Sequence, residues 1–128
     1  MKLYLDDIRK APEGWVPVRT FGDAIQLLEE QTVEEMSFDH DLGMGLTGYD
    51  VLKWIERKVF EGTYIPPKIW IHTGNPVGRK KMLAAKKQIE KMMKERSVQE
   101  IVEQIHIEDV TVQDVQNLKT LLGKRNVG

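Results

Sequence analysis

The sequence reads EMSFDHDLG over residues 35–43, so a short apolar segment runs directly into three titratable side chains. Residues 35–38 have the length and composition of a buried strand, and Asp39, His40 and Asp41 follow where that strand ends. Alternation along an extended chain directs Asp39 and Asp41 to one side and His40 to the other. A polar loop with Asp41 in an Asx turn into Gly43 is the alternative interpretation.

Two further segments share this pattern of an apolar strand that ends in polar side chains. Residues 2–5 run into Asp6-Asp7, and residues 68–71 run into His72-Thr73. A fourth candidate strand, from Trp15 to Thr20, contains Pro17, which predicts an edge position because proline cannot donate a ladder hydrogen bond.

Helical periodicity fills the gaps between these strands. We expect one helix that opens at Gly22-Asp23, one capped by Thr47 that stops before Gly62, and one from about Arg79 to Arg96. Beyond it, Ser97 to Glu100 resembles a capping box that opens a short helix. Ile105 and Ile107 alternate with polar residues as in a short fifth strand, and Thr111 is placed to cap a last helix that ends near Gly123.

Strands that alternate with helices predict a three-layer open parallel α/β sheet of four or five strands. We interpret the chain as a single domain over 1–128, with a core of about 2–96 and a C-terminal helical segment of about 97–123. In such sheets the functional groups gather beyond the carboxyl ends of the strands. The three polar strand ends are therefore expected in one crevice.

Composition excludes several classes of protein. The chain has 128 residues, 41% hydrophobic residues, and 19 basic against 20 acidic residues, and it contains no cysteine. Thiolate metal sites, disulfide scaffolds and cysteine nucleophiles are thus ruled out. No apolar run has the length of a membrane span, and the N-terminus runs straight into Asp6-Asp7 rather than into an apolar signal region. We expect a cytoplasmic protein.

Adjacent carboxylates at a strand end repel each other, and a hard cation such as Mg²⁺ relieves that repulsion. The alternative for Asp6 and Asp7 is that one caps a turn while the other is solvated. For His72 alone, a hydrogen-bonded histidine at a strand end is the simpler interpretation. Convergence of the three strand ends favours a site that binds a metal and a phosphate and moves a proton.

The turn Pro76-Val77-Gly78 leads into a basic helix that begins with Arg79. A helix N-terminus flanked by cations is suited to a phosphate group. The lysines farther along the helix are better explained as a solvated outer face, because no aromatic residues accompany them. Nucleic acid is therefore an unlikely partner of this helix.

An ordered set of motifs runs through this chain: LDDIR at 5–9, Trp15, SFDHDLG at 37–43, TGYD at 47–50 and HTGNP at 72–76. The set resembles the cyclic-phosphate-processing receiver-like domain (cREC), an offshoot of response-regulator receiver domains, over about residues 3 to 85. The resemblance implies a receiver or flavodoxin-like sheet. It departs from an ordinary receiver domain, because only a short loop joins Asp7 to Trp15 and the first receiver helix is missing.

We therefore expect a metal-dependent phosphoesterase that acts on a cyclic phosphate or nucleotide. The expected ligands of Mg²⁺ or Mn²⁺ are Asp6, Asp7, Asp39 and Asp41, the catalytic groups are His40, His72 and Asp39, and the phosphate contacts are Arg9, Thr73 and Asn75. The alternative is a non-catalytic receiver-like module that binds a partner protein or a phosphorylated ligand, or is phosphorylated on Asp39. The expected partner is a small phosphorylated ligand, with a protein partner as the second candidate. No membrane partner is expected, and the sequence leaves the oligomeric state open.

Overall fold

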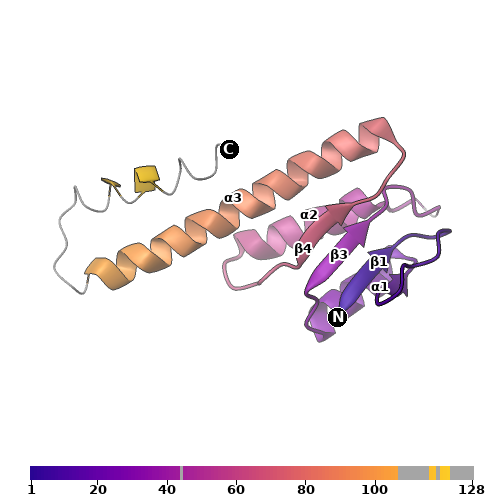
Figure 1. The fold of residues 1–128 in the computed structure, drawn as a ribbon, viewed down its shortest axis with the longest axis horizontal. Coiled ribbons are helices and arrows are strands. Elements are labelled where there is room, and N and C mark those ends of the chain that lie inside the picture. Colours follow the sequence, from indigo (N-terminus) through magenta and orange to yellow (C-terminus); the bar gives the residue numbers. More distant parts are fainter. Residues whose placement is uncertain (44, 107–115, 118, 122–128) are drawn as a thin grey trace. The chain divides into compact units, whose positions relative to one another are not determined.

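The computed structural model describes residues 1–43, 45–106, 116–117 and 119–121. The chain divides into two compact units, Met1–Glu90 and Lys91–Gly128. Its elements follow in the order β1 (Lys2–Leu5), β2 (Val16–Val18), α1 (Phe21–Glu30), β3 (Glu35–Phe38), α2 (Gly48–Phe60), β4 (Lys68–Ile71) and α3 (Pro76–His106) (Figure 1).

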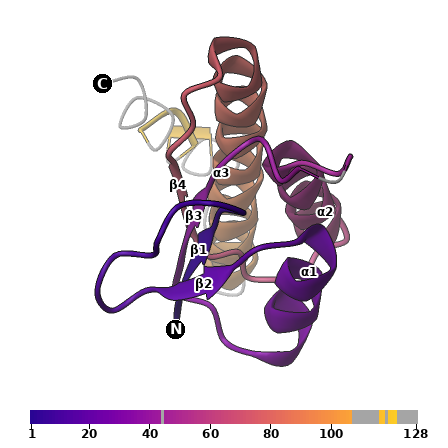
Figure 2. The same cartoon turned by 90° about the vertical axis from the view of Figure 1, so that its right-hand side faces the viewer.

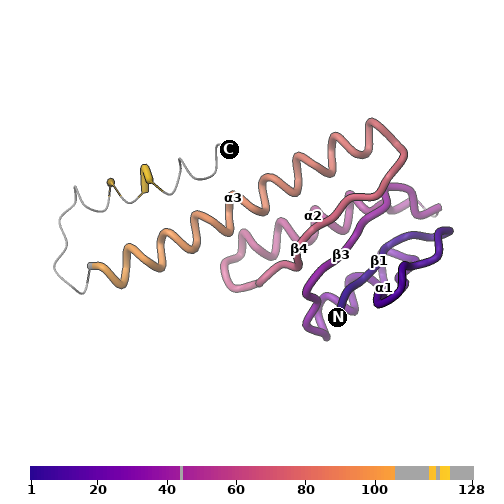
Figure 3. Tube along the Cα trace, in the orientation of Figure 1, coloured from indigo at the N-terminus to yellow at the C-terminus, as the bar shows by residue number. Residues whose placement is uncertain are grey.

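The four strands form one parallel sheet in the order β2-β1-β3-β4. The register aligns Leu3 of β1 with Met36 of β3, and Met36 with Ile69 of β4. Figure 3 shows the backbone of these three strands running side by side. The predicted strands and the edge position of the Pro17 strand are confirmed, and so is the receiver-like α/β class.

One face of the sheet forms the core of the first unit. Figure 2 shows α1, α2 and the start of α3 on this same side of the sheet. The buried side chains of the strands meet those of the helices there: Leu3, Leu5, Met36, Phe38 and Ile69 from the sheet, and Ala24, Leu28, Val51, Leu52, Ile55, Val59, Met82, Ala85 and Ile89 from the helices. Each large aliphatic side chain contributes about 1.5–3 kcal/mol when it is removed from water.

The strand order explains why the helices share one face. The connections β2 to β3 and β3 to β4 step across the sheet in one direction, whereas β1 to β2 steps in the other. Right-handed crossovers that step in opposite directions lie on opposite faces. The β1–β2 connection is a loop rather than a helix, as predicted, so within residues 1–90 no helix covers the second face. The predicted three-layer arrangement is therefore wrong for these residues, which form two layers, because the helix that would cover the second face is the one replaced by this loop.

Side chains cap the first two helices. Thr20 accepts the Asp23 N–H, so α1 begins at Phe21, one residue before the predicted start. Thr47 and Asp50 form a reciprocal capping box at the start of α2. This helix ends at Phe60, and Gly62 follows with a positive φ of 115°, which is consistent with the predicted stop.

Helix α3 departs from the prediction at both ends. It begins at Pro76, because the Asn75 side chain accepts the Gly78 N–H and proline is favoured in the first helical turn. It continues through Ser97 to His106, so the predicted new helix start at Ser97 is wrong. No glycine or proline interrupts residues 79–106, and most of these residues are good helix formers.

The predicted fifth strand is wrong at Ile105 and His106, which belong to α3. Ile107, Thr111 and Gly123, on which the rest of the C-terminal prediction depends, lie outside the described residues. Residues 116–117 and 119–121 are helical. In the described part of the chain, no helix combines the length and the apolar character needed to cross a bilayer.

Gly48 offers a test of how closely α2 must approach the end of β3. Its N–H donates to the His40 carbonyl, and a Cβ at this position would collide with the carbonyl oxygen of Asp39. We expect Gly48→Ala to lower the free energy of unfolding by at least about 1 kcal/mol. Gly22→Ala in α1 is the matched control, since nothing lies near its added methyl group, and it should stabilise by up to about 1 kcal/mol. Urea unfolding measures both, and equal stabilities of the two variants would contradict this packing.

Candidate metal centre

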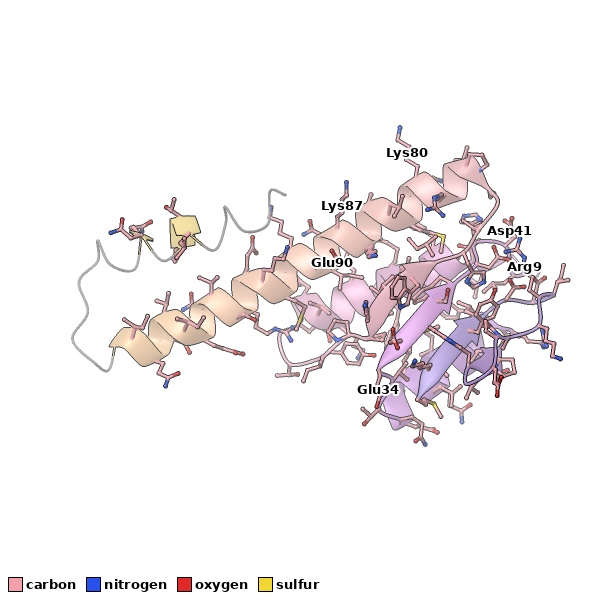
Figure 4. All side chains as sticks on the ribbon, in the orientation of Figure 1. Arg9, Glu34, Asp41, Lys80, Lys87 and Glu90 are labelled. Atoms are coloured by element: carbon pink, nitrogen blue, oxygen red, sulfur yellow. The ribbon has the colours of Figure 1, made fainter. Side chains whose placement is uncertain are left out.

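The predicted site residues converge at the carboxyl edge of the sheet. A pocket of about 610 Å³ opens there and is lined by Asp6, Asp7, Ile8, Arg9, Asp39, Asp41, Gly43, Thr73, Gly74 and Asn75. Figure 4 shows Arg9 and Asp41 at this edge, whereas Glu34 lies at the opposite end of the sheet. The residues come from the ends of β1, β3 and β4, as expected for an open parallel sheet.

Three carboxylates form the acidic centre of this pocket. One oxygen each of Asp6, Asp7 and Asp39 lies within 4.8 Å of the others. Two unit charges at that separation repel by about 3.5 kcal/mol at an effective dielectric constant of about 20. Two oxygen ligands of one Mg²⁺ at about 2.1 Å lie up to about 4.2 Å apart. Small side-chain rotations therefore suffice for the three oxygens to share one hard cation, and the donor set fits Mg²⁺ or Mn²⁺.

Asp6 is the buried member of the three, with 1% exposure. Its Oδ1 accepts the backbone N–H groups of Ile8 at 2.9 Å and Arg9 at 2.7 Å, and its Oδ2 lies 3.1 Å from Nε2 of His72. Burial acts to raise the pKa of Asp6, but these hydrogen bonds outweigh it and hold the pKa below its usual range. Asp6 is thus a fixed, ionised carboxylate.

His72 lies behind Asp6 rather than in the lining of the pocket. Its Nδ1 is 2.6 Å from Oγ of Ser37, and its ring stacks on Tyr4 with a centroid distance of 4.1 Å. Burial lowers the pKa of His72 below its usual range, and the neighbouring Asp6 offsets this only in part. The predicted catalytic imidazole is therefore neutral near pH 7, and both of its ring nitrogens have partners within the protein.

Asp39 and Asp41 line the pocket, while His40 packs on the other side against Gly78 of α3. This is the alternation that the sequence predicts. Oδ1 of Asp39 accepts the His40 N–H at 2.8 Å. Asp41 is not among the three clustered carboxylates; its side chain is 66% exposed and lies 2.8 Å from Nδ1 of His40.

A glycine turn brings the loop after β3 up against Asp7. Gly43 has a φ of 78°, which favours glycine, and a Cβ there would lie 2.9 Å from Oδ2 of Asp7. Gly43 therefore serves both the backbone turn and the close approach of the loop to the carboxylate.

The three predicted phosphate-binding residues lie in the same pocket. Arg9 donates from Nη1 to the His72 carbonyl at 3.0 Å and keeps further N–H donors, and its side chain is 55% exposed. Oγ1 of Thr73 accepts the Asn75 N–H, and Oδ1 of Asn75 accepts the Gly78 N–H. Within the part of the chain that the structure describes, the hydroxyl proton of Thr73 and the amide N–H₂ of Asn75 have no acceptor, so both can donate.

Three residues with no assigned role in the sequence belong to the site. Ser37 and Tyr4 hold His72, and Nη1 of Arg19 lies 3.4 Å from the backbone carbonyls of both Asp6 and Asp7. The sequence contained a sign of each role. Tyr4 and Ser37 precede Asp6 and Asp39 by two residues, so their side chains lie on the same side of the sheet as those acids. Arg19 directly follows β2 and therefore lies at the same edge of the sheet.

Comparison with known families gives one match. The model of the cyclic-phosphate processing receiver domain matches residues 1–88, which contain every residue of this pocket. Comparison with curated proteins and with solved structures gives no match.

The lowered pKa of His72 has a consequence for stability. Because the unfolded chain binds a proton at His72 more readily than the folded chain, stability should fall as the pH drops below 6.5, the usual imidazole pKa. Asp6, with its lowered pKa, contributes a similar loss only near and below 3.8. Chemical unfolding between pH 6.5 and 3.8 should therefore give a flatter pH dependence for His72→Gln than for the wild type. Identical slopes would show that His72 is not held in its neutral form.

Proposed function

Since the chain belongs to the cyclic-phosphate processing receiver domain family, we propose that it is a metal-dependent phosphoesterase that opens a cyclic phosphate. The main support for this proposal is that a single pocket contains both clustered carboxylates and hydrogen-bond donors. Three clustered carboxylates suit a divalent cation, and Arg9, Thr73 and Asn75 beside them offer donors to phosphate oxygens.

Asp6, Asp7 and Asp39 are the residues that would hold Mg²⁺ or Mn²⁺. When bound, the cation neutralises phosphate charge and lowers the pKa of a water molecule. Asp6 is held by backbone N–H groups, so it presents a fixed ligand. Asp7 and Asp39 are only partly buried and can adjust their carboxylates to the ion.

Phosphate oxygens would bind to the donors on the other side of the pocket. The Arg9 guanidinium supplies charge-assisted hydrogen bonds, and the Thr73 hydroxyl supplies a neutral one. Asn75 stands at the start of α3, where the helix dipole also favours a negative group. These contacts would hold a phosphate group beside the carboxylates.

His40 and Asp41 are the pair that we assign to proton transfer. They are hydrogen bonded to each other, and Asp41 reaches the pocket, whereas both ring nitrogens of His72 are engaged elsewhere. A water oxygen attacks phosphorus, one ring P–O ester bond breaks, the pair accepts the water proton, and the leaving alkoxide takes up a proton. The net reaction adds one water molecule and yields a phosphomonoester.

A second function is supported by the position of Asp39 itself. It follows the central strand β3, next to two acidic residues after β1 and to Thr73 after β4, which resembles a receiver phosphoacceptor. Acetyl phosphate with Mg²⁺ separates the two functions. A mass increase of one phosphoryl group that is lost in Asp39→Asn supports the phosphoacceptor module rather than the phosphoesterase.

Cyclic phosphate turnover tests the proposal directly. We expect hydrolysis of a 2′,3′-cyclic or a 3′,5′-cyclic nucleotide with Mn²⁺ or Mg²⁺, and its loss after chelation of the metal. Asp39→Asn should lower kcat/KM by at least about 100-fold, since it removes charge from the metal site. Glu34→Gln, at the far end of the sheet, is the matched control that removes one carboxylate charge without effect. Absence of turnover of both nucleotide classes by folded, metal-loaded protein would refute the enzymatic function.

Two glycines of the loop after β3 give a finer test of the metal ligands. Gly43 and Gly45 have similar positive φ values of 78° and 89°, so alanine strains the backbone similarly at both. Only at Gly43 would the added methyl group meet the Asp7 carboxylate. We expect Gly43→Ala to weaken Mn²⁺ binding by about 10-fold or more relative to Gly45→Ala, a difference of about 1.4 kcal/mol. Titration calorimetry measures both affinities, and equal weakening would remove Asp7 from the proposed ligand set.

A further inference from the structure

The second face of the sheet, which no helix of residues 1–90 covers, carries a chain of contacts that ends at Asp6. Tyr4 of β1 is aligned with Ser37 of β3, and Ser37 with Trp70 of β4. His72 lies two residues beyond Trp70 and therefore points to the same face. The ladder continues past the strand ends, because the His72 N–H donates to the Phe38 carbonyl at 2.9 Å. Backbone pairing thus fixes where the His72 side chain starts.

The surroundings of the imidazole fix its orientation. Tyr4 stacks on the imidazole at an interplanar angle of 7°, which fixes the plane of the ring. The contacts of Nδ1 with Ser37 and of Nε2 with Asp6 fix the positions of the two nitrogens within that plane. Ser37 is 7% exposed and Asp6 is 1% exposed, so water does not compete strongly for either partner.

The donors and acceptors then place a proton on Nε2 of His72. Oδ1 of Asp6 is occupied by two backbone donors, and the carboxylate can only accept from the imidazole. The shared proton therefore lies on Nε2. Ser37, whose hydroxyl can donate or accept, is the hydrogen-bond partner of Nδ1.

We propose that Ser37 and His72 are positioning residues for the acidic centre: Ser37 and the stacked Tyr4 hold the His72 ring, and its Nε2–H orients Oδ2 of Asp6 for a cation shared with Asp7 and Asp39. The inference rests on the proposed function and gives His72 a role other than acid–base catalysis. Each carboxylate oxygen has two lone pairs, so Oδ2 keeps one for the ion. Hydrogen-bonded partners that orient a metal ligand in this way typically change metal affinity by about 10–100-fold when they are removed.

A pair of amide variants separates positioning from packing. The side-chain N–H₂ of Gln reaches about as far as Nε2 of histidine, whereas that of Asn is one methylene shorter and does not reach Asp6. We expect His72→Asn to weaken Mn²⁺ binding by about 10–100-fold and His72→Gln to recover most of that loss. Melting temperatures of the two variants establish that both are folded. Equal Mn²⁺ affinities of folded His72→Asn and His72→Gln would overturn the positioning role.

The proton on Nε2 can be observed directly. Long-range ¹H–¹⁵N correlation spectra of the metal-free wild type should show a proton on Nε2 of His72. Ser37→Ala should weaken Mn²⁺ binding, while Ser97→Ala, on the exposed surface of α3, should leave it unchanged. A His72 ring that carries its proton on Nδ1 and none on Nε2 overturns the assignment. If wild-type protein binds no Mn²⁺, the proposed function falls together with the positioning role; if it binds Mn²⁺ and the His72 variants bind equally well, only the positioning role falls.

Discussion

In-register parallel pairing of β1 with β3 is the constraint on which the rest of this structure depends. It aligns Leu5 with Phe38, so the residues that follow the two strands, Asp6-Asp7 and Asp39, must emerge side by side at one edge of the sheet. Pairing of β3 with β4 brings His72 and Thr73 to the same edge. The apolar side chains of the strands bury against helices on one face, and that burial holds the register, since a slip of one residue would turn the core outward. Core packing therefore maintains the crowding of three carboxylates, which is unfavourable by itself.

The loops around the site offset the repulsion between the three carboxylates. The turn after β1 folds back so that two backbone N–H groups stabilise the ionised form of Asp6. Glycines occur where main chain and site residues come closest: Gly43 beside the Asp7 carboxylate, Gly48 beside the Asp39 carbonyl and Gly78 beside the His40 ring. A side chain at Gly48 would collide with the backbone after β3, and a side chain at Gly43 or Gly78 would displace the Asp7 carboxylate or the His40 ring. The pocket thus results as much from close backbone approach as from its charged side chains.

The loop between β1 and β2 shapes the remaining half of the site. In its place, a helix would cover the second face of the sheet, because a right-handed crossover in that direction lies there. The loop leaves that face to Tyr4, Trp15, Ser37 and Trp70, which pair with one another or with polar neighbours: Trp15 meets Tyr4 edge-on, and the Trp70 indole donates to Glu35. It is on this face that His72 reaches Asp6. The loop between β1 and β2 thus leaves uncovered the same face of the sheet on which His72 contacts Asp6.

The sequence by itself determined the four strands, the edge position of the proline-containing strand, the caps of α2 and the acids and donors of the pocket, because strand composition, capping and strand-end polarity are local properties. The length of α3 was predicted wrongly although it too follows from local sequence, because the capping pattern at Ser97 lies within a long run of helix formers that continues the helix. The sequence also did not show that the two histidines differ in their surroundings. His72 is enclosed by Tyr4, Ser37 and Asp6. His40 lies beside Asp41 and Gly78. The two histidines follow their strands in similar ways. Their surroundings come from residues distant in the sequence, and only tertiary packing brings those residues together.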